Sequence, residues 1–244
     1  MFKYLTSFLI VSILTACSSE TGLDDQRSSA LIKPDFSMKQ ARFDCLLSKD
    51  KSLNSLEAFI PNFVIKTKES LPSASLEILF NQEASIDKFS LFYLDNDMNF
   101  NSDTVRNLLD EEGISDFAAC IMHNNQMLSS NLYIDNKVLN LDSFEVEILD
   151  CKFNNEFNYG TFSIEVDSFL NLIRNQNILY FAKFQQVNEL SSEFTWINYL
   201  GSNSDKDILY KGWINEEDSI TIQESFNTQS TCESATSYKG YKVL

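Results

Sequence analysis

Apolar and polar positions follow a recognisable order in the first half of the chain. The run RFDCLL is typical of a strand, and the apolar residues after Ser52 recur three and four positions apart, as on one face of a helix. Pro61 is expected to end or kink this helix. Two strand-like runs and a polar, helix-compatible segment follow. The pattern predicts a strand at 42–47, a helix at 53–63, strands at 75–84 and 87–94, a helix within 102–127 and a strand at 131–135.

The second half repeats this order. The run ILDCKF again places Asp-Cys inside an apolar, strand-like stretch, and a helical pattern and two strand-like runs come after it. The pattern predicts a strand at 148–153, a helix around 166–173, strands at 177–187 and 192–200, a helix within 205–230 and a strand at 238–244.

Short sequence echoes link the two halves. Asp44-Cys45 recurs as Asp150-Cys151 at an offset of 106. The other echoes are Phe89 with Phe194 at 105, Phe80-Asn81-Gln82 with Phe184-Gln185-Gln186 at 104, Glu111-Glu112 with Glu216-Glu217 at 105, and Cys120 with Cys232 at 112. Ordered echoes at a nearly constant offset predict a tandem duplication, with a seven-residue insertion before the last cysteine.

The element order of each half, βαββαβ, resembles the ferredoxin-like fold. Two such units in one chain are similar in plan to the dimeric α+β barrel, in which two antiparallel sheets pack face to face with helices outside. The resemblance rests on element order over residues 41–244. It implies an α+β protein of two tandem ferredoxin-like repeats, at 41–140 and 141–244, whose sheets form a pseudo-dimeric barrel.

The N-terminal segment has the features of an export signal. Lys3 precedes about ten mostly apolar residues, which fits a signal peptide and is shorter than the roughly 20 residues of a membrane-spanning helix. The stretch LTAC, which ends at Cys17, resembles the lipobox of bacterial lipoproteins. The resemblance implies that residues 1–16 are removed and that Cys17 carries lipid. The alternative is an ordinary signal peptide with Cys17 near the cleavage site.

The same resemblance implies a place in the cell. Two or more acyl chains anchor a protein stably, so the lipid on Cys17 would make a membrane the predicted partner. Ser18 resembles the residue found in lipoproteins sorted to the outer membrane of Gram-negative bacteria, on its periplasmic side. Residues 17–40 lack sustained periodicity and are rich in Ser, Asp and Gln, so we expect a flexible tether there.

The charge of the chain excludes one class of partner. There are 19 Lys and Arg against 35 Asp and Glu, which gives a net charge of −16 at neutral pH. Proteins that bind nucleic acid draw most of their affinity from Lys and Arg on phosphates. We therefore expect no nucleic-acid partner.

Four cysteines besides Cys17 point to disulfides. An even number of cysteines in a chain predicted to be exported favours cross-links, and four cysteines allow three pairings. If the halves are equivalent, each closes its own bridge, Cys45–Cys120 and Cys151–Cys232, and ties its first strand to its second helical region. No two cysteines have the C-x-x-C spacing of a catalytic dithiol.

Motifs for catalysis are weak. His123 is the only histidine, so the usual His-rich or Cys/His zinc site cannot be built from it, and we expect a surface or interface residue. The sequence has neither a P-loop nor a G-x-G-x-x-G motif. We therefore predict no catalytic residue, no bound metal and no cofactor.

One polar loop, DNDMNFNSDTVR at 95–106, has partial calcium-loop spacing. Phe100 stands where an EF-hand loop needs Gly, and Arg106 stands where it needs a closing Glu. The alternative is a loop whose Asn and Asp side chains form turns and cap the next helix. The oxygen-bearing residues at the 1, 3, 5, 7 and 9 positions are Asp95, Asp97, Asn99, Asn101 and Asp103.

Aromatic residues are abundant in the third predicted strand of each half. Alternation along a strand sends some of them into the core and others outward. Core packing is the leading interpretation. The alternative is a cavity between the sheets, where relatives of the dimeric α+β barrel type hold small aromatic or haem-like molecules. The candidate lining residues are Phe89, Tyr93, Phe194 and Trp196.

Two hypotheses for function remain. The leading one is a non-catalytic, lipid-anchored periplasmic protein that acts as a binding or interaction module, with a protein or small molecule of unknown identity as its partner. The alternative is a small-molecule-binding protein or enzyme of the dimeric α+β barrel type that uses the space between the sheets.

Overall fold

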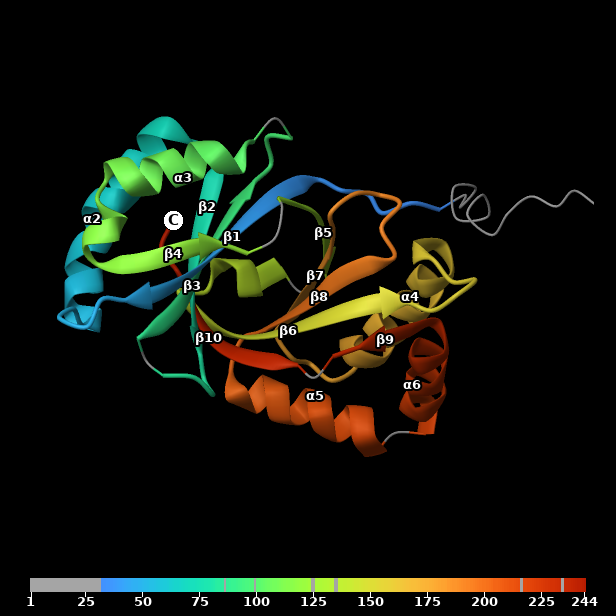
Figure 1. Ribbon diagram of the computed structural model, residues 1–244. Helices are drawn as coiled ribbons and strands as arrows, with labels where there is room; N and C mark the ends of the chain where they lie inside the picture. The colour runs from blue at the N-terminus through green and yellow to red at the C-terminus, as the bar shows by residue number, and fades with distance from the viewer. Residues whose placement is uncertain are drawn as a thin grey trace, which may run out of the picture.

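Strands from both halves of the chain close one barrel. The computed structural model describes residues 32–244 except positions 86, 99, 124, 125, 134, 135, 216 and 234. Figure 1 shows the strands in the middle of the molecule, α2 and α3 on one side of them, and α4, α5 and α6 on the opposite side.

The two halves contain the same elements in nearly the same order. The first half consists of β1 (Met38–Leu47), α2 (Leu53–Ser70), β2 (Ala74–Asn81), β3 (Lys88–Asp95), α3 (Ser102–Glu111), the 3₁₀ turn η1 (Ile114–Asp116), β4 (Ala118–Met122) and β5 (Met127–Tyr133). After a second 3₁₀ turn, η2 (Asn136–Asn140), the second half consists of β6 (Ser143–Phe153), α4 (Tyr159–Arg174), β7 (Tyr180–Gln186), β8 (Glu193–Leu200), α5 (Asn203–Asn215), α6 (Glu217–Gln229), β9 (Ser230–Cys232) and β10 (Thr236–Lys242).

The barrel closes because each half completes the sheet of the other. Its strand order is β10-β2-β3-β1-β5-β7-β8-β6, and the pairing of β6 with β10 joins the two ends. The last strand of the first half, β5, pairs with its own β1 and with β7 of the second half. In the same way, β10 pairs with its own β6 and with β2 of the first half. All of these pairings are antiparallel. The predicted pair of ferredoxin-like units in a pseudo-dimeric barrel is confirmed.

The final strand of each unit is divided into two pieces, which the sequence pattern did not predict. The short first pieces, β4 and β9, pair with the far ends of β1 and β6. They carry Cys120 and Cys232, directly opposite Cys45 and Cys151. Both predicted disulfides, Cys45–Cys120 and Cys151–Cys232, are present. The prediction that they end in a helical region was wrong, because β4 and β9 are too short to show a clear alternation of apolar and polar residues.

Strand register relates the two halves residue by residue. Cys45 and Cys151 pair with Phe89 and Phe194, which agrees with the offsets of 106 and 105. Further along the sheet, Leu79 pairs with Ser90, and Gln185 pairs with Thr195. Leu79 therefore corresponds to Gln185, at an offset of 106. The echo of Phe80-Asn81-Gln82 at 104 was wrong by two residues.

The pseudo-twofold axis that relates the halves runs along the barrel. Four antiparallel pairings separate β1 from β6 in the strand order, so these two strands run in the same direction. Residues related by the duplication therefore lie at the same height, on opposite walls of the barrel.

Three apolar clusters form the core. One fills the barrel and includes Phe92, Phe181 and Tyr199. The other two lie outside the barrel, one under α2 and α3 and one under α4, α5 and α6. Pro61 does not end α2, which continues to Ser70. Phe63 and Thr67 beyond the proline are buried, and this packing offsets the backbone hydrogen bond that proline cannot donate.

Both ends of the described chain pack on the fold. The expected tether was to extend to residue 40, but β1 begins at Met38 and Phe36 stacks on Phe184. At the other end, the backbone N–H of Leu244 donates to the carbonyl of Leu76 in β2. Figure 1 places the C-terminus beside α2 and α3 of the first half. None of the helices in the described part of the chain is long and apolar enough to span a bilayer.

Gly240 lets β10 approach β6 and β2 closely. A Cβ atom at this position would overlap the ring of Phe144 and lie 2.9 Å from Cδ2 of Leu79. We expect Gly240→Ala to lower the free energy of unfolding by about 1–3 kcal/mol, as overpacked cores do, in a urea titration. Adding Phe144→Leu should recover part of this loss. Equal stability of Gly240→Ala and the wild type would show that the strands can separate without cost.

Each disulfide closes a long loop within one half, with sequence separations of 75 and 81. The double variant Cys45→Ala/Cys120→Ala should lower the free energy of unfolding by roughly 2–5 kcal/mol, because the unfolded chain gains freedom. Cys151→Ala/Cys232→Ala should have a similar effect. Urea titrations without reductant measure both, and unchanged midpoints would contradict this account.

Candidate functional site

A cavity of about 270 Å³ lies between the outer face of β6 and β8 and the helices α4, α5 and α6. We call it the helix-side cavity. Most of its wall is apolar or aromatic, with a few polar groups among these side chains. Its apolar side chains are Leu149, Phe162, Phe169, Phe194, Trp196, Leu209, Trp213 and Phe226, and its polar ones include Glu147, Asn198, Tyr210, Asn227 and Ser230.

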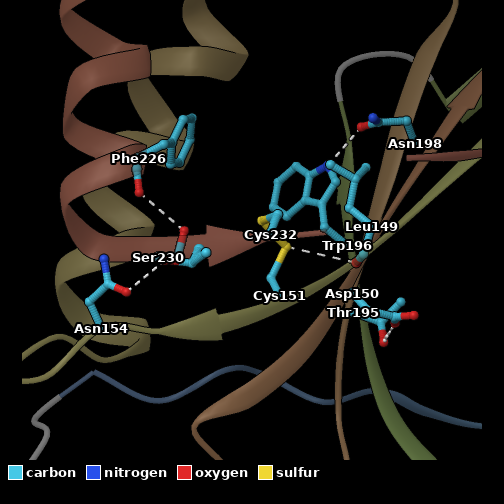
Figure 2. The surroundings of a disulfide bond; sticks show 11 residues. Leu149, Asp150, Cys151, Asn154, Thr195, Trp196, Asn198, Phe226, Ser230 and Cys232 are labelled. Atoms are coloured by element: carbon cyan, nitrogen blue, oxygen red, sulfur yellow. Dashed lines mark hydrogen bonds between the residues drawn. A yellow bond between two sulfur atoms is a disulfide. The ribbon is translucent and has the colours of Figure 1, made fainter. Parts of the chain in front are cut away.

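Three pairs of residues, opposite one another on β6 and β8, form the floor of this cavity. They are Cys151 with Phe194, Leu149 with Trp196, and Glu147 with Asn198. Figure 2 shows the indole of Trp196 beside the Cys151–Cys232 disulfide, with Phe226 of α6 facing this floor. The disulfide thus holds one end of the floor to β9, which leads directly out of α6.

Asn198 has an unused donor at one end of the cavity floor. Its Oδ1 accepts hydrogen bonds from Trp196 Nε1 at 2.6 Å and from the Tyr180 hydroxyl at 2.7 Å. These two bonds fix the orientation of the amide (Figure 2 shows the first). Within the described residues, the Nδ2 group has no hydrogen-bond partner. Asn198 therefore offers a fixed N–H donor to a ligand.

Glu147 offers an acceptor next to this donor. Its carboxylate is buried, and Oε1 accepts from the Tyr210 hydroxyl at 2.6 Å and from Lys206 Nζ at 2.9 Å. No described residue donates to Oε2. Burial and the bond to Glu147 raise the pKa of Tyr210, so its hydroxyl keeps its proton. Asn198 and Glu147 together form a donor–acceptor pair in a largely apolar cavity.

The first half provides an internal comparison. By register, its counterparts of Glu147 and Asn198 are Ala41 and Tyr93, which also face one another. The ring of Tyr93 packs edge-on against Phe43 and Phe63 in the core under α2. A single ten-residue helix, α3, stands where the second half has α5 and α6. The polar pair and the larger helical cover are thus specific to the second half.

The four aromatic candidates are divided between the halves. Phe194 and Trp196 line the helix-side cavity. Phe89 and Tyr93 are buried in the core of the first half. These residues were expected to line a cavity between the sheets, but the cavity that Phe194 and Trp196 line lies between a sheet and its helices.

Glu147 and Asn198 were missed by the sequence analysis. In FEVEILD, the apolar Phe144, Val146 and Ile148 alternate with Glu145 and Glu147, which is the pattern of a strand with one face in water. Helix α5 covers that face instead, and its Lys206 and Tyr210 contact Glu147. The charged residue at a strand position opposite Asn198 was the only signal in the sequence.

Two of the calcium-loop candidates, Asp95 and Asn101, act as turn and cap residues. Asp95 accepts from the Ser73 hydroxyl and from the backbone N–H of Asp97. Asn101 caps α3 by accepting from the N–H of Asp103. Asn99 lies outside the described residues. The described residues contain no group of three or more His, Cys, Asp or Glu that could hold a metal ion.

His123 follows β4 and is bound to Asp44 of β1. Its Nδ1 is 3.0 Å from Asp44 Oδ2, while Ser90 and Arg42 donate to Oδ1. Burial acts to raise the pKa of Asp44, but the bonds from His123, Ser90 and Arg42 outweigh it and hold that pKa well below its usual value. Cys17, the predicted lipid site, lies outside the described residues.

Comparison with known proteins shows the fold. No family model and no curated protein sequence matches the chain. Among solved structures, chlorite dismutase from Candidatus Nitrospira defluvii in complex with imidazole has a TM-score of 0.55 at 6% identity, over 85% of this chain and 92% of that chain. A protein from Thermus thermophilus described as a novel heme-binding protein has a TM-score of 0.54 at 10% identity, over 84% and 91%. A candidate monooxygenase from Fusobacterium nucleatum has a TM-score of 0.50 at 11% identity, over 86% and 94%.

These similarities correct one prediction. We expected no cofactor, and this is contradicted by a structural neighbour that is described as heme-binding.

The residues around the helix-side cavity, however, do not fit haem. Haem iron takes His, Cys thiolate, Met or Tyr ligands. Both cysteines here are in a disulfide, and Tyr210 is held protonated by Glu147. His123 is elsewhere, bound to Asp44. The chain has the dimeric α+β barrel fold of these proteins.

The Asp44 cluster predicts a pH dependence. Because the folded-state pKa of Asp44 is lowered, its contribution to stability is complete above the unfolded value of about 4 and is lost as the pH falls below it. The carboxylate is partly exposed, so Asp44→Asn should cost only about 1 kcal/mol at pH 7. Urea titrations between pH 7 and pH 3 should show this difference shrinking. Asp150→Asn, at the equivalent position with one hydroxyl donor, is the control, and an equal effect there would contradict the assignment.

Proposed function

We propose that this protein binds a small, uncharged aromatic molecule in the helix-side cavity. The observation that carries the proposal is the pair of Glu147 and Asn198 at one end of a cavity whose remaining walls are largely apolar. An aromatic ligand would pack against Trp196, Trp213 and the phenylalanine rings. A hydroxyl or N–H on its edge would donate to Glu147, and an oxygen would accept from Asn198.

The charge of the site favours a neutral ligand. Glu147 is buried and already paired with Lys206, so a second carboxylate placed beside it would be repelled. A hydroxyl donor would instead form a charge-assisted hydrogen bond with Oε2, which is stronger than a bond between neutral groups. The site thus favours a neutral ligand with a hydrogen-bond donor over an anionic ligand.

The alternative hypothesis from the sequence now has more support than the leading one. Proteins with this fold include chlorite dismutase and a heme-binding protein, which favours a small-molecule site over a purely structural module. The helix-side cavity, with its polar pair of Glu147 and Asn198, also favours a small-molecule site.

We further propose that the site works outside the cytoplasm. The predicted signal peptide and lipid on Cys17 would place the protein at the outer membrane on its periplasmic side. Two disulfides within the chain support export, because such bonds persist mainly in oxidising compartments.

Intrinsic fluorescence provides a direct test. The chain has two tryptophans, Trp196 and Trp213, and both line the cavity. We expect N-phenyl-1-naphthylamine, a neutral probe, to bind with energy transfer from these indoles. 2-Naphthol should then displace the probe, and 2-naphthoate should do so at least tenfold more weakly.

Substitutions locate the binding. Glu147→Gln should weaken 2-naphthol by about tenfold, as loss of a charged hydrogen bond does, and should narrow the difference from 2-naphthoate. Glu145→Gln is the matched control, since Glu145 is a buried, ion-paired neighbour on β6 that does not line the cavity. Equal effects of the two variants would contradict the proposal. A second result would also contradict it. If haemin displaced the probe and gave a visible absorption band that Tyr210→Phe abolished, the cavity would hold haem.

A further inference from the structure

A buried group of three polar side chains crosses the barrel. Lys183 Nζ lies 3.2 Å from Glu77 Oε1 and donates to the Tyr199 hydroxyl at 2.8 Å. The Tyr199 hydroxyl in turn donates to Glu77 Oε2 at 2.8 Å. Lys183 is 2% exposed and Tyr199 is 1% exposed. None of these residues lines the helix-side cavity.

Glu77 and Lys183 are each other's counterparts in the duplication. Glu77 pairs with Phe92, and Lys183 pairs with Ile197, the residue that corresponds to Phe92. The two side chains therefore reach toward the pseudo-twofold axis from opposite walls at one height. In a barrel of two identical halves, a residue here would meet a copy of itself, and like charges would repel.

Stability does not account for this ion pair. Buried ion pairs are often no more stable than apolar side chains of similar volume. Elsewhere in the same barrel, Phe92, Leu79 and Phe181 form an apolar core, so the interior accepts the apolar solution. A buried lysine with an acid and a phenol in contact is instead an arrangement that proteins use for chemistry.

The lysine faces a pocket that opens at one end of the barrel. This barrel-mouth pocket has a volume of about 440 Å³ and lies where β1 and β2 begin and β8 ends. Lys183, Glu77 and Tyr199 line it, with Ser75, Asn96 and Lys242 nearby. The ammonium has three N–H donors, and the described residues accept two of them. The third is available to a molecule in the pocket.

We propose that Lys183 is a nucleophile that forms a Schiff base with a small carbonyl compound in the barrel-mouth pocket. Lysines act in this way when they are desolvated or lie beside a second cation. Both conditions hold here: burial lowers the pKa of Lys183, Glu77 opposes this effect, and the charge of Lys242 lowers it further.

The neighbouring groups account for every proton in the step. Lys183 Nζ transfers one proton to Glu77, and its lone pair attacks the carbonyl carbon. The carbonyl oxygen takes a proton from the Tyr199 hydroxyl, and Glu77 returns a proton to Tyr199. The carbinolamine nitrogen then gives its second proton to Glu77, which passes it through Tyr199 to the carbinolamine hydroxyl, and that hydroxyl leaves as water. The product is a protonated imine between Lys183 and the carbonyl carbon, in which nitrogen keeps its third proton and Glu77 is again a carboxylate, with no change in oxidation state.

Reductive trapping tests this proposal. The full chain is treated with acetaldehyde and cyanoborohydride, and alkylation of each lysine is followed by peptide mass mapping. Exposure alone predicts that Lys183 reacts more slowly than Lys66, whose side chain is 51% exposed. We expect Lys183 to react at least tenfold faster than Lys66. Equal or slower reaction of Lys183 would overturn the proposal.

Two variants separate chemistry from folding. Tyr199→Phe keeps the ring over Lys183 but removes the proton donor, and it should slow labelling of Lys183 by about tenfold while that of Lys66 is unchanged. Unchanged labelling of Lys183 would contradict the role of Tyr199. Because Lys183→Met alone leaves Glu77 buried without its partner, the double variant Lys183→Met/Glu77→Leu is used to keep the fold. It should lose the fast labelling phase, and persistence of that phase would place the reactive amine elsewhere. Probe binding in the helix-side cavity is independent of these results.

Discussion

The exchange of last strands between the two halves is the constraint on which the structure depends. Neither sheet is complete alone: β5 must reach β7, and β10 must reach β2. This closure removes free sheet edges and fixes the axis along the barrel. It also leaves each sheet with an outer face that its own helices must cover. The two disulfides hold the far ends of β1 and β6 to the divided last strands, next to these outer faces.

Within that frame, the halves have diverged in two places. On the outer face, Ala41 and Tyr93 correspond to Glu147 and Asn198, and a filled core corresponds to a cavity. On the axis, one copy carries Glu77 and the other Lys183. Both changes require a fused chain, because identical subunits cannot place different residues at equivalent positions. Duplication within one chain thus allows the second half to carry a cavity and a polar pair where the first half has a filled core.

The sequence was sufficient for the parts that depend on local pattern. Alternation of apolar residues and the Asp-Cys echo predicted the strands, the two repeats and both disulfides. The sequence was insufficient where contacts between residues that are distant in the chain determine the structure. Glu147 had the pattern of a solvent-facing residue until α5 covered it, and Lys183 lies in the apolar run NILYFAKFQQV, where nothing local indicates that Glu77 faces it across the barrel. The strand that carries Cys120 was not predicted because it is too short to show a clear pattern.

The central claim is that the second half holds a small neutral aromatic molecule against β6 and β8. The most direct measurement is a ¹⁵N NMR titration of the full chain with 2-naphthol. The chain has two indole N–H groups, on Trp196 and Trp213, and the account predicts that both shift together with the side-chain amide of Asn198, while backbone amides around Tyr93 and Phe63 in the first half do not. Shifts confined to the first half, or no shifts at saturating ligand, would contradict it.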